Sequence, residues 1–476
     1  MNSGQHTDTI VAPATLPGTG ALSILRISGP DCLRIADAIL QLKEGTLSQA
    51  KGYTAHFASV SGRDGALLDE VVATVFRAPH SYTGEDALEI SCHASAYILE
   101  ELTRLILAAG ARMAEPGEFT RRAFLNGRMD LAQAEAVADV ISSTTAASHR
   151  IAMNQLKGGV SRELAELRGE LLEMTSLLEL ELDFSEEEVE FADRKSLLAL
   201  LEKVTNHIHK LTESYRLGNA IKHGVPVAIA GPANAGKSTL LNALLGEDRA
   251  IVSDIAGTTR DTIEESLNIG GILFRFIDTA GIRESSDTVE KLGIERTFRK
   301  ISEAEIVLAL LDGSESESVL LNNLKEILQQ VNPTNQKVLI LLNKSDKIAI
   351  LSSNNFVTNL NKLVLSLGIE VDSFAVAAKS GEGLEAVKKR LIELEKDLIP
   401  NADSTFITNQ RHYDALCEAA RHLENVRTSL LSGIPGDLVA EDLRGAISSL
   451  GRITGDGLLT PDEILGHIFK NHCIGK

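Results

Sequence analysis

The feature that most constrains the fold of this chain is the segment GPANAGKS, which runs from Gly231 to Ser238. It follows the apolar run VPVAIA and precedes the helical run TLLNALL, so it has the flanking strand and helix that a phosphate-binding loop requires. A loop of this kind surrounds phosphate groups with backbone N–H groups at the positive end of a helix. In such a loop we expect Lys237 to contact the β and γ phosphates and the Ser238 hydroxyl to bind Mg²⁺.

The region around this loop, between roughly His223 and Ile399, alternates apolar strand patterns with helical patterns. Its strand-like runs are VPVAIA, FRFIDT, IVLALLD and KVLILLN. Such alternation is typical of a mainly parallel sheet wrapped by helices, where ligands bind at the carboxyl ends of the strands. We therefore expect a phosphate-loop α/β domain over this region.

Two further polar motifs follow strands in this region. DTAG runs from Asp278 to Gly281, where the aspartate can hold magnesium through water and the glycine N–H can reach a γ-phosphate. NKSD runs from Asn343 to Asp346, and a carboxylate there can accept two hydrogen bonds from the N1 and N2 donors of guanine, a pair that adenine lacks. NKSD alone would also suit a polar turn. In this order, each at the end of a strand, the motifs predict a guanine-nucleotide site.

The sequence on either side of this domain is of two kinds. From Thr9 to about Arg122 it has short strand patterns, TIVAPAT, ALSILRISG, EVVATVF and DALEIS, and then an apolar helix around Tyr97 to Ala109, which is an α+β pattern. Beyond it, and again after residue 400, apolar residues follow the helical period. The two stripes are Leu164, Leu167, Leu171, Met174 and Leu178, and Leu416, Ala419, Leu423, Val426 and Leu430.

These patterns favour one helical domain with the α/β domain inserted into it, because neither helical part has an obvious core of its own. Two independent helical bundles are the alternative. The expected division is 1–122 for an N-terminal α+β domain, 123–222 for the first helical part, 223–399 for the nucleotide-binding domain and 400–476 for the second helical part. We expect the acidic run FSEEEVEFAD, from Phe184, to be a solvated helix face.

Charge and hydropathy argue against two classes of protein. The formal net charge of -19 argues against RNA binding through a broadly basic surface, so any RNA contact must be local or supplied by a partner. Apolar stretches such as Ile306–Leu311 fall far short of the roughly 18 residues that cross a bilayer. The opening MNSGQHTDTI has no basic start and no apolar signal core. We expect a cytoplasmic protein with reduced, scattered thiols.

The nucleotide motifs GPANAGKS, GTTRD, DTAG and NKSD resemble those of the translation-factor-like class of GTPases. Segments outside the nucleotide-binding domain bring the resemblance closer, to the tRNA-modification GTPases of the MnmE (TrmE) family. These segments are TIVAPAT with ILRISG, SYTGED, EPGEF with RRAFLNGRMDLAQAEA, and the terminal CIGK, and they extend over essentially the whole chain. Era-like and Der-like ribosome-assembly GTPases share the nucleotide motifs but neither the first nor the last segment.

The resemblance implies a homodimer formed through an N-terminal domain that binds a reduced folate of the 5-formyltetrahydrofolate type, with the methylene form as one-carbon donor. It also implies a hetero-oligomer with the flavoprotein MnmG (GidA), with tRNA as substrate and no membrane partner. Such proteins together place an aminomethyl or carboxymethylaminomethyl group on carbon 5 of the wobble uridine. GTP hydrolysis, dependent on Mg²⁺ and K⁺, drives a conformational change in the inserted domain.

The resemblance also implies roles for individual residues. Thr259 joins Ser238 in the magnesium site, and the potassium ligands are Asn234, Ser253, Ile255 and Thr258. Glu290 matches the glutamate that orients the attacking water, although by residue type alone it would be a surface acid. The residues expected to bind GTP are Asn234, Ala235, Gly236, Lys237, Ser238, Thr239, Ser253, Asp254, Ile255, Ala256, Gly257, Thr258, Thr259, Asp278, Thr279, Ala280, Gly281, Asn343, Lys344, Asp346, Ala377, Ala378 and Lys379.

Within the nucleotide-binding domain the chain departs from the family pattern in four places. Pro232 lies one position earlier than the usual loop proline, and Ser253 stands where a threonine is usual, with hydroxyl chemistry retained. The guanine-supporting element, SAK in the family, is Ala377–Lys379 here and has lost its hydroxyl. Position 282 is Ile, so the chain lacks a Ras-like water-positioning glutamine after DTAG.

For the folate, the resemblance points to Arg26, Glu85, Arg128 and Lys476, with Arg128 standing where a lysine is common. On the expected strand ALSILRIS, Arg26 shares a face with Leu22 and Ile24, and an arginine on an apolar face requires a partner. The alternative is an edge strand with a snorkelling arginine.

The C-terminal CIGK places Cys473 fourth from the end, as in a prenylation signal, but glycine is not aliphatic and lysine is a poor final residue. Thr460, Pro461 and Glu463 fit a helix start that would carry CIGK to a site. Whether Cys473 is a nucleophile or a packing residue stays open. Two other functions also stay open, an RNA-binding ribosome-assembly GTPase without modification chemistry and a lipid-anchored signalling switch.

Overall fold

The computed structural model describes residues 8–16, 18–183, 194–246, 265–277, 301–347, 354–396, 405–432, 434, 436–456 and 475. The chain forms two compact units. The first comprises Met1–Ile141, Asn154–Asn206 and Ala415–Lys476, and the second comprises Ser142–Met153 and His207–Asp414.

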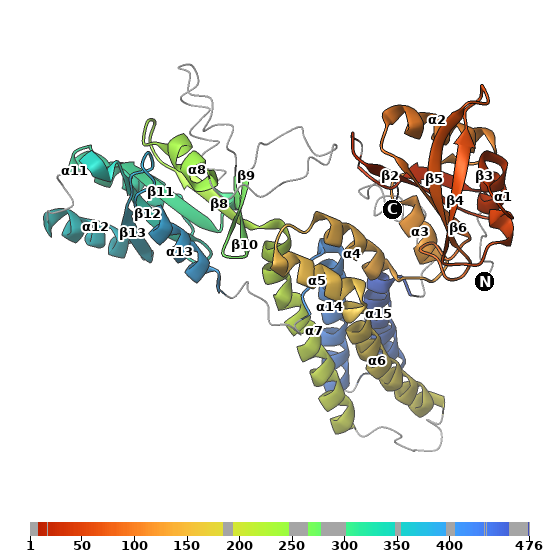
Figure 1. Cartoon of the computed structure of the whole chain (residues 1–476). Helices are drawn as coiled ribbons and strands as arrows, with labels where there is room; N and C mark the ends of the chain where they lie inside the picture. The colour runs from red at the N-terminus through yellow and green to blue at the C-terminus, as the bar shows by residue number, and fades with distance from the viewer. Residues whose placement is uncertain are drawn as a thin grey trace. The chain divides into compact units, whose positions relative to one another are not determined.

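The first unit begins with a seven-stranded sheet in the order β3-β4-β5-β6-β2-β1-β7. Neighbouring strands are antiparallel except β1 and β7, which are parallel. Helices α1 and α2 pack their apolar sides against one face of this sheet and form its core (Figure 1). The expected α+β pattern is confirmed. Its elements are β1 (Ile10–Pro13), β2 (Leu22–Ser28), α1 (Cys32–Ile39), β3 (Leu40–Leu42), β4 (Thr54–Ser61), β5 (Leu67–Phe76), β6 (Ala87–His93), α2 (Ala96–Ala108), β7 (Arg112–Met113) and α3 (Glu118–Leu125).

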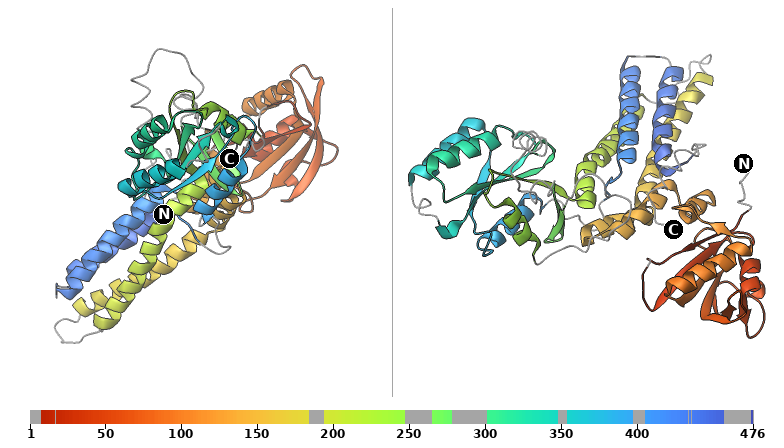
Figure 2. Two further views of the ribbon diagram at one scale, coloured as in Figure 1. Left: turned by 90° about the vertical axis from the view of Figure 1, so that its left-hand side faces the viewer. Right: turned by 90° about the horizontal axis from the view of Figure 1, so that it is seen from above.

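The rest of the first unit is helical, and its long helices lie side by side in Figures 1 and 2. Both apolar stripes expected from the sequence are buried. Helix α6, which precedes the second unit in the sequence, packs along α15, which follows it. Two independent bundles are therefore excluded, and one helical domain is built from two separate parts of the chain. The helices after α3 are α4 (Leu131–Ser142), α5 (Ala146–Leu156), α6 (Gly159–Asp183), α7 (Arg194–His223), α14 (Gln410–Leu431) and α15 (Gly436–Thr454), and α4, α5, α7 and α14 also supply residues to the second unit.

The second unit contains a six-stranded sheet in the order β13-β12-β11-β8-β10-β9. All pairs are parallel except the β9–β10 hairpin. The mainly parallel α/β domain predicted from the alternating pattern is therefore confirmed. Its elements are β8 (Val225–Ala230), α8 (Lys237–Leu245), β9 (Glu265–Ile269), β10 (Ile272–Phe276), β11 (Ile306–Asp312), α11 (Glu317–Leu328), β12 (Lys337–Asn343), α12 (Asn354–Leu367), β13 (Val371–Ala375) and α13 (Leu384–Leu394).

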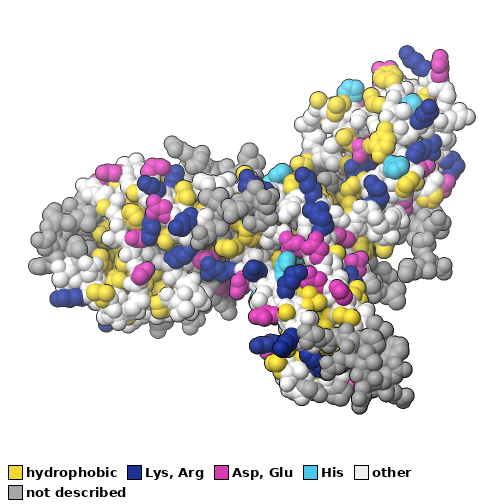
Figure 3. Space-filling view, turned by 90° about the horizontal axis from the view of Figure 1, so that it is seen from below, with side chains coloured by type: hydrophobic (Ala, Val, Ile, Leu, Met, Phe, Trp, Pro, Cys, Tyr) yellow, Lys and Arg dark blue, Asp and Glu magenta, His cyan; other side chains and the backbone are white. Residues whose placement is uncertain are grey.

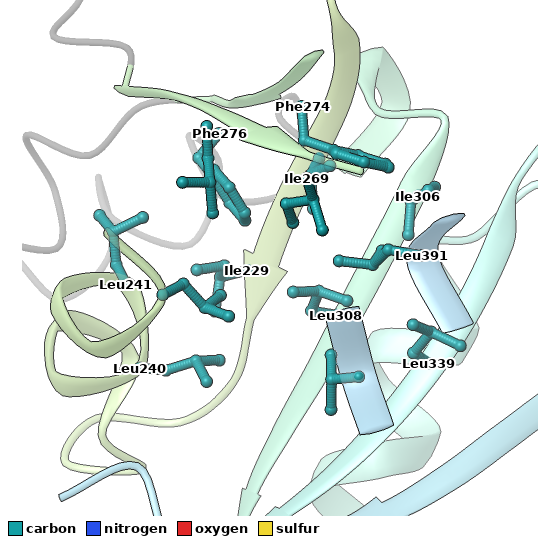
Figure 4. Close-up of a cluster of buried hydrophobic side chains, with 14 of the residues drawn as sticks. Ile229, Leu240, Leu241, Ile269, Phe274, Phe276, Ile306, Leu308, Leu339 and Leu391 are labelled. Atoms are coloured by element: carbon teal, nitrogen blue, oxygen red, sulfur yellow. The ribbon is translucent and has the colours of Figure 1, made fainter. Parts of the chain in front are cut away.

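Apolar cores on both faces of this sheet hold its strands in register. On one face α8 and α13 pack over the strands, and Figure 4 shows Ile229, Leu240, Leu241, Phe276 and Leu308 gathered in this core. On the other face α11 and α12 cover a second apolar cluster. Strands buried on both faces read as continuous apolar runs, which explains IVLALLD and KVLILLN. Because the five parallel strands point the same way, their carboxyl ends lie along one edge of the sheet.

Candidate functional site

The loop Gly231–Gly236 joins the carboxyl end of β8 to the start of α8, in the central part of the parallel sheet. Gly231 passes so close to β11 that a Cβ atom there would lie 2.2 Å from the Leu310 carbonyl oxygen. Gly236 has a φ of +97°, and a Cβ there would lie 2.3 Å from Nδ2 of Asn343. Neither position accepts a side chain, so both glycines are required by this loop. Asn234 also adopts the left-handed region, with a φ of 63°.

The loop surrounds the side chain of Lys237, the first residue of α8. Its Nζ donates to the carbonyl oxygens of Gly231 and Pro232, at 2.8 and 2.7 Å. Burial lowers the pKa of Lys237. The ammonium is therefore held inside the curve of the loop, at the N-terminus of a helix, where a phosphate would receive both its charge and the helix N–H groups. Ser238 occupies the next position of the helix, and Thr239 is exposed.

Asn343, the last residue of β12, joins three loops of the site. Its Nδ2 donates to the carbonyl oxygen of Ala235 at 2.8 Å, and its Oδ1 accepts the N–H of Ala378 at 3.0 Å. The residue is buried, so both side-chain atoms act inside the protein. The phosphate-binding loop, the NKSD segment and the Ala377–Lys379 loop are thus fixed relative to one another by one side chain.

The other residues of NKSD differ in exposure: Lys344 is half-buried, whereas the carboxylate of Asp346 is exposed. Lys344 forms an ion pair with Asp312, the last residue of β11, and it has a φ of 63°. Burial would raise the pKa of Asp312, but the hydrogen bonds from Lys344 and Ser314 outweigh burial and lower it. Asp346 is exposed at the same edge, free to receive hydrogen bonds from a base. Sequence reasoning missed Asp312, although its place at the end of a buried strand was a signal for it.

The structure therefore brings the phosphate-binding loop, Asn343, Lys344, Asp346 and the Ala377–Lys379 loop together at the carboxyl edge of one sheet. The remaining nucleotide residues expected from the sequence lie outside the described residues. They are Ser253, Asp254, Ile255, Ala256, Gly257, Thr258, Thr259, Asp278, Thr279, Ala280, Gly281 and Glu290.

A second candidate site lies in the first unit, around Arg26. This arginine is on β2, between β1 and β6, so the edge-strand alternative is wrong. Leu25 and Ile27 face the core, whereas Arg26 lies on the opposite face, where Leu22 is exposed. The expectation of a partner is confirmed, because Arg26 Nη2 pairs with Glu89 at 2.7 Å.

Aromatic rings surround the same arginine. Its guanidinium carbon lies 5.3 Å from the ring centre of Tyr82 and 5.7 Å from that of Phe119, distances at which a cation is attracted by a ring. Its Nη1 donates to the carbonyl oxygen of Gly475 at 3.0 Å. The buried Gly475 therefore lies beside Arg26 and precedes Lys476, which, with Cys473, lies outside the described residues.

The loop from Ser81 to Asp86 places the other two described candidates on this side of the domain. The Glu85 carboxylate accepts a hydrogen bond from the Ser28 hydroxyl at 2.8 Å. Arg128 runs across Gly84, where an added Cβ would lie 3.1 Å from its Cγ. Glu85 thus lies in the same loop as Tyr82, whose ring faces Arg26, and Arg128 packs against that loop at Gly84. The domain boundary expected at residue 122 falls inside α3. The side chain of Arg122 donates a hydrogen bond to the backbone of Asp8, at the start of the N-terminal part of the unit.

The fold and the first site define a phosphate-loop nucleotide-binding protein of the guanine-specific class. A family model for the MnmE helical domain matches residues 131–473, and a model for the N-terminus of the GTP-binding protein TrmE matches residues 9–128. The tRNA modification GTPase MnmE of Parabacteroides distasonis is 47% identical over 474 residues, which cover 98% of this chain and 100% of that protein. The protein of the same name from Bacteroides thetaiotaomicron is 48% identical over 476 residues, which cover 99% of this chain and 100% of that protein. This chain belongs to the family of tRNA modification GTPases MnmE, as its sequence motifs predicted.

Proposed function

We propose that this protein hydrolyses GTP with Mg²⁺ and K⁺, as a homodimer that works with the flavoprotein MnmG to modify carbon 5 of the wobble uridine in tRNA. A reduced folate held in the N-terminal part supplies the one-carbon unit, and the product carries an aminomethyl or carboxymethylaminomethyl group. The observation that carries the proposal is the full-length likeness to proteins named tRNA modification GTPase, in a chain that combines a guanine-type site with the Arg26 site.

Supporting the GTP part, Lys237 and the N-terminus of α8 supply positive charge where phosphates bind, and Asp346 supplies a carboxylate where guanine binds. The Ser238 hydroxyl, in the first turn of α8, suits a magnesium ligand. Asn234 is exposed in the same loop, and its side-chain oxygen suits a larger monovalent cation. In this proposal Thr259 completes the magnesium site, the 253–258 loop completes the potassium site, and Glu290 orients the attacking water.

The Arg26 site suits a folate in three chemical respects. A folate offers N–H donors on its pterin, flat aromatic rings, and carboxylates on its glutamate tail. The site offers the Glu85 carboxylate as an acceptor, the rings of Tyr82 and Phe119 as packing surfaces, and the guanidinium groups of Arg26 and Arg128 as donors to carboxylates. Lys476 would add a further cation beside Arg26. When bound, the methylene form supplies the carbon that is transferred.

An exposed apolar patch on the N-terminal sheet supports the homodimer. Phe57 of β4 and Val72 of β5 are direct cross-strand partners, and the two residues are 53% and 40% exposed. Tyr53 lies at the same end of the sheet, edge-on to Phe76, with ring centres 5.8 Å apart. Covering such a patch with the same patch of a second copy removes apolar surface from water on both sides.

The charge pattern favours tRNA binding that is shared with a partner protein or confined to a local basic site. On the face shown in Figure 3, basic and acidic side chains of the described residues are interspersed. The net charge is -19, so electrostatic attraction to a polyanion must come largely from the partner flavoprotein or from a local basic site. The structure describes no helix that is both long enough and apolar enough to span a bilayer.

Nucleoside analysis of tRNA tests the proposal. Cells lacking this protein should lose the modified wobble uridine, and the wild-type gene should restore it. The restored level should fall with Lys237→Ala, which removes the phosphate-binding ammonium. An unchanged nucleoside profile in the deletion would instead favour a ribosome-assembly GTPase, and ribosome profiles of the same cells would then show immature subunits.

A further inference from the structure

Arg122 of α3 is the largest fully buried side chain of the described residues, and it is a cation. Its guanidinium contacts three carboxylates. Nη2 donates to Glu118 at 3.0 Å and to Asp8 at 2.9 Å, and Nη1 lies 3.3 Å from each oxygen of Glu85. A buried cation is tolerated only when it is paired and hydrogen-bonded. These contacts satisfy that requirement, together with a hydrogen bond of 3.0 Å from Nη1 to the carbonyl oxygen of Asp8.

The charges of this network leave Glu85 in excess. Arg112 also pairs with Glu118 and with Asp8. Burial would raise the pKa of Glu118, but hydrogen bonds from Arg112, from the backbone of Glu115 and from Arg122 lower it to about 2. Two arginines thus face three carboxylates, and the first two carboxylates are each held by both arginines. The third, Glu85, is paired with Arg122 alone of these two arginines, through the longer contacts of 3.3 Å.

The contacts to Glu85 fix its position without saturating it. Arg122 Nη1 is equidistant from both carboxylate oxygens, and the Ser28 hydroxyl donates to Oε2 at 2.8 Å. Ser28 is itself hydrogen-bonded to Thr83 at 2.7 Å. An ionised carboxylate has about four acceptor positions, and 3.3 Å is long for a charge-assisted hydrogen bond. Glu85 therefore retains the capacity to accept N–H donors from a bound molecule.

We propose that Arg122 is a positioning residue for folate binding: it holds the Glu85 carboxylate in place as the acceptor for N–H donors of the pterin ring. The inference rests on the folate site proposed above. The guanidinium fixes the carboxylate from within the domain, so the acceptor is ordered before the ligand arrives. The Ser28 hydroxyl, itself hydrogen-bonded to Thr83, donates to Oε2 of the same carboxylate.

Calorimetry with 5-formyltetrahydrofolate on the full-length protein tests this inference. The variant Arg122→Lys keeps the charge but loses the planar fork that reaches three carboxylates at once. We expect its affinity to fall by about tenfold or more, since an acceptor left unfixed loses most of a charge-assisted hydrogen bond. The matched control is Glu118→Gln, which disturbs the same buried network without contacting Glu85. It should lower the melting temperature at least as much while its folate affinity changes by less than about threefold.

A double-mutant cycle with Glu85→Gln separates positioning from general stability. If Arg122 acts through Glu85, Arg122→Lys should cost no further affinity once residue 85 is glutamine. Ser28→Ala, a smaller change, should show the same dependence on Glu85 and serves if Arg122→Lys does not fold. Additive losses in both cycles, or equal affinity losses in Arg122→Lys and Glu118→Gln, would overturn the inference. Failure of the wild-type protein to bind the folate would instead overturn the proposed folate function, and this inference with it.

Discussion

The side chain of Asn343 donates a hydrogen bond of 2.8 Å to the carbonyl oxygen of Ala235, more than a hundred residues earlier in the chain. It thereby ties the loop that surrounds phosphate to the strand end that carries Asp346. Since its Oδ1 also accepts the Ala378 N–H, one buried amide orders both ends of the nucleotide site.

We predict that Asn343→Ala weakens GDP and GTP binding by at least tenfold and destabilises the second unit by about 2 to 4 kcal/mol, because a buried carbonyl and a buried N–H lose their partner. Titration with a fluorescent guanine nucleotide and thermal unfolding measure the two effects. As a control, Asn322→Ala removes an exposed amide from the solvent side of helix α11 and should leave both quantities nearly unchanged. If the variant binds nucleotide as tightly as the wild type does, the Asn343 side chain does not order the nucleotide site.

Asp346→Asn should shift nucleotide preference from GTP towards xanthosine triphosphate. An amide presents one donor and one acceptor in place of two acceptors, which suits the 2-keto group of xanthine. Competition between the two nucleotides measures the change. If the variant prefers GTP as strongly as the wild type does, Asp346 does not contact the base.

Glu290→Ala should leave GTP binding nearly intact and lower the hydrolysis rate by roughly a hundredfold or more, as expected for a group that positions the attacking water. Single-turnover hydrolysis and equilibrium binding distinguish the two effects. Weakened binding with a normal maximal rate would contradict this role.

GTP hydrolysis should depend on potassium and fall steeply when sodium replaces it. The phosphate oxygens carry negative charge throughout the reaction, and a cation held by Asn234 and the 253–258 loop would supply the charge that an arginine supplies in other GTPases. Oxygen ligands at fixed positions would favour the larger ion. Steady-state rates at matched ionic strength in KCl and NaCl measure this. Asn234→Ala should abolish the difference, and equal wild-type rates in both salts would exclude a potassium site.

Arg26→Ala should reduce folate affinity by about tenfold or more, because the arginine supplies paired charge-assisted hydrogen bonds beside two aromatic rings. Glu89 would lose its partner as well, so Glu89→Gln is the control for loss of the ion pair alone. Calorimetry with a reduced folate compares them. A variant Arg26→Ala that binds like the wild type would place the folate elsewhere.

Local sequence patterns determined the position of the phosphate-binding loop and the type of many helices and strands. The order of strand, glycine loop and helix around Lys237 placed the phosphate-binding loop, because backbone geometry there requires glycine at fixed positions. Continuous apolar runs predicted strands buried on both faces, and steps of three and four predicted the helical stripes, since each period follows from the geometry of a single element.

Contacts between distant segments were decided only by the tertiary structure. A local repeat of apolar residues cannot show which distant segments meet. Examples are the interior position of β2, the packing of α6 on α15 and the place of Gly475 beside Arg26. Asn343 belongs to a nucleotide motif in the sequence, but its bond to Ala235 depends on β8 and β12 lying in one sheet, with β11 between them. Arg122 reads as one charge of a helical run. Its burial among Asp8, Glu85 and Glu118 exists only once α3 has packed against the sheet, because burial and charge pairing belong to the folded domain and not to the chain.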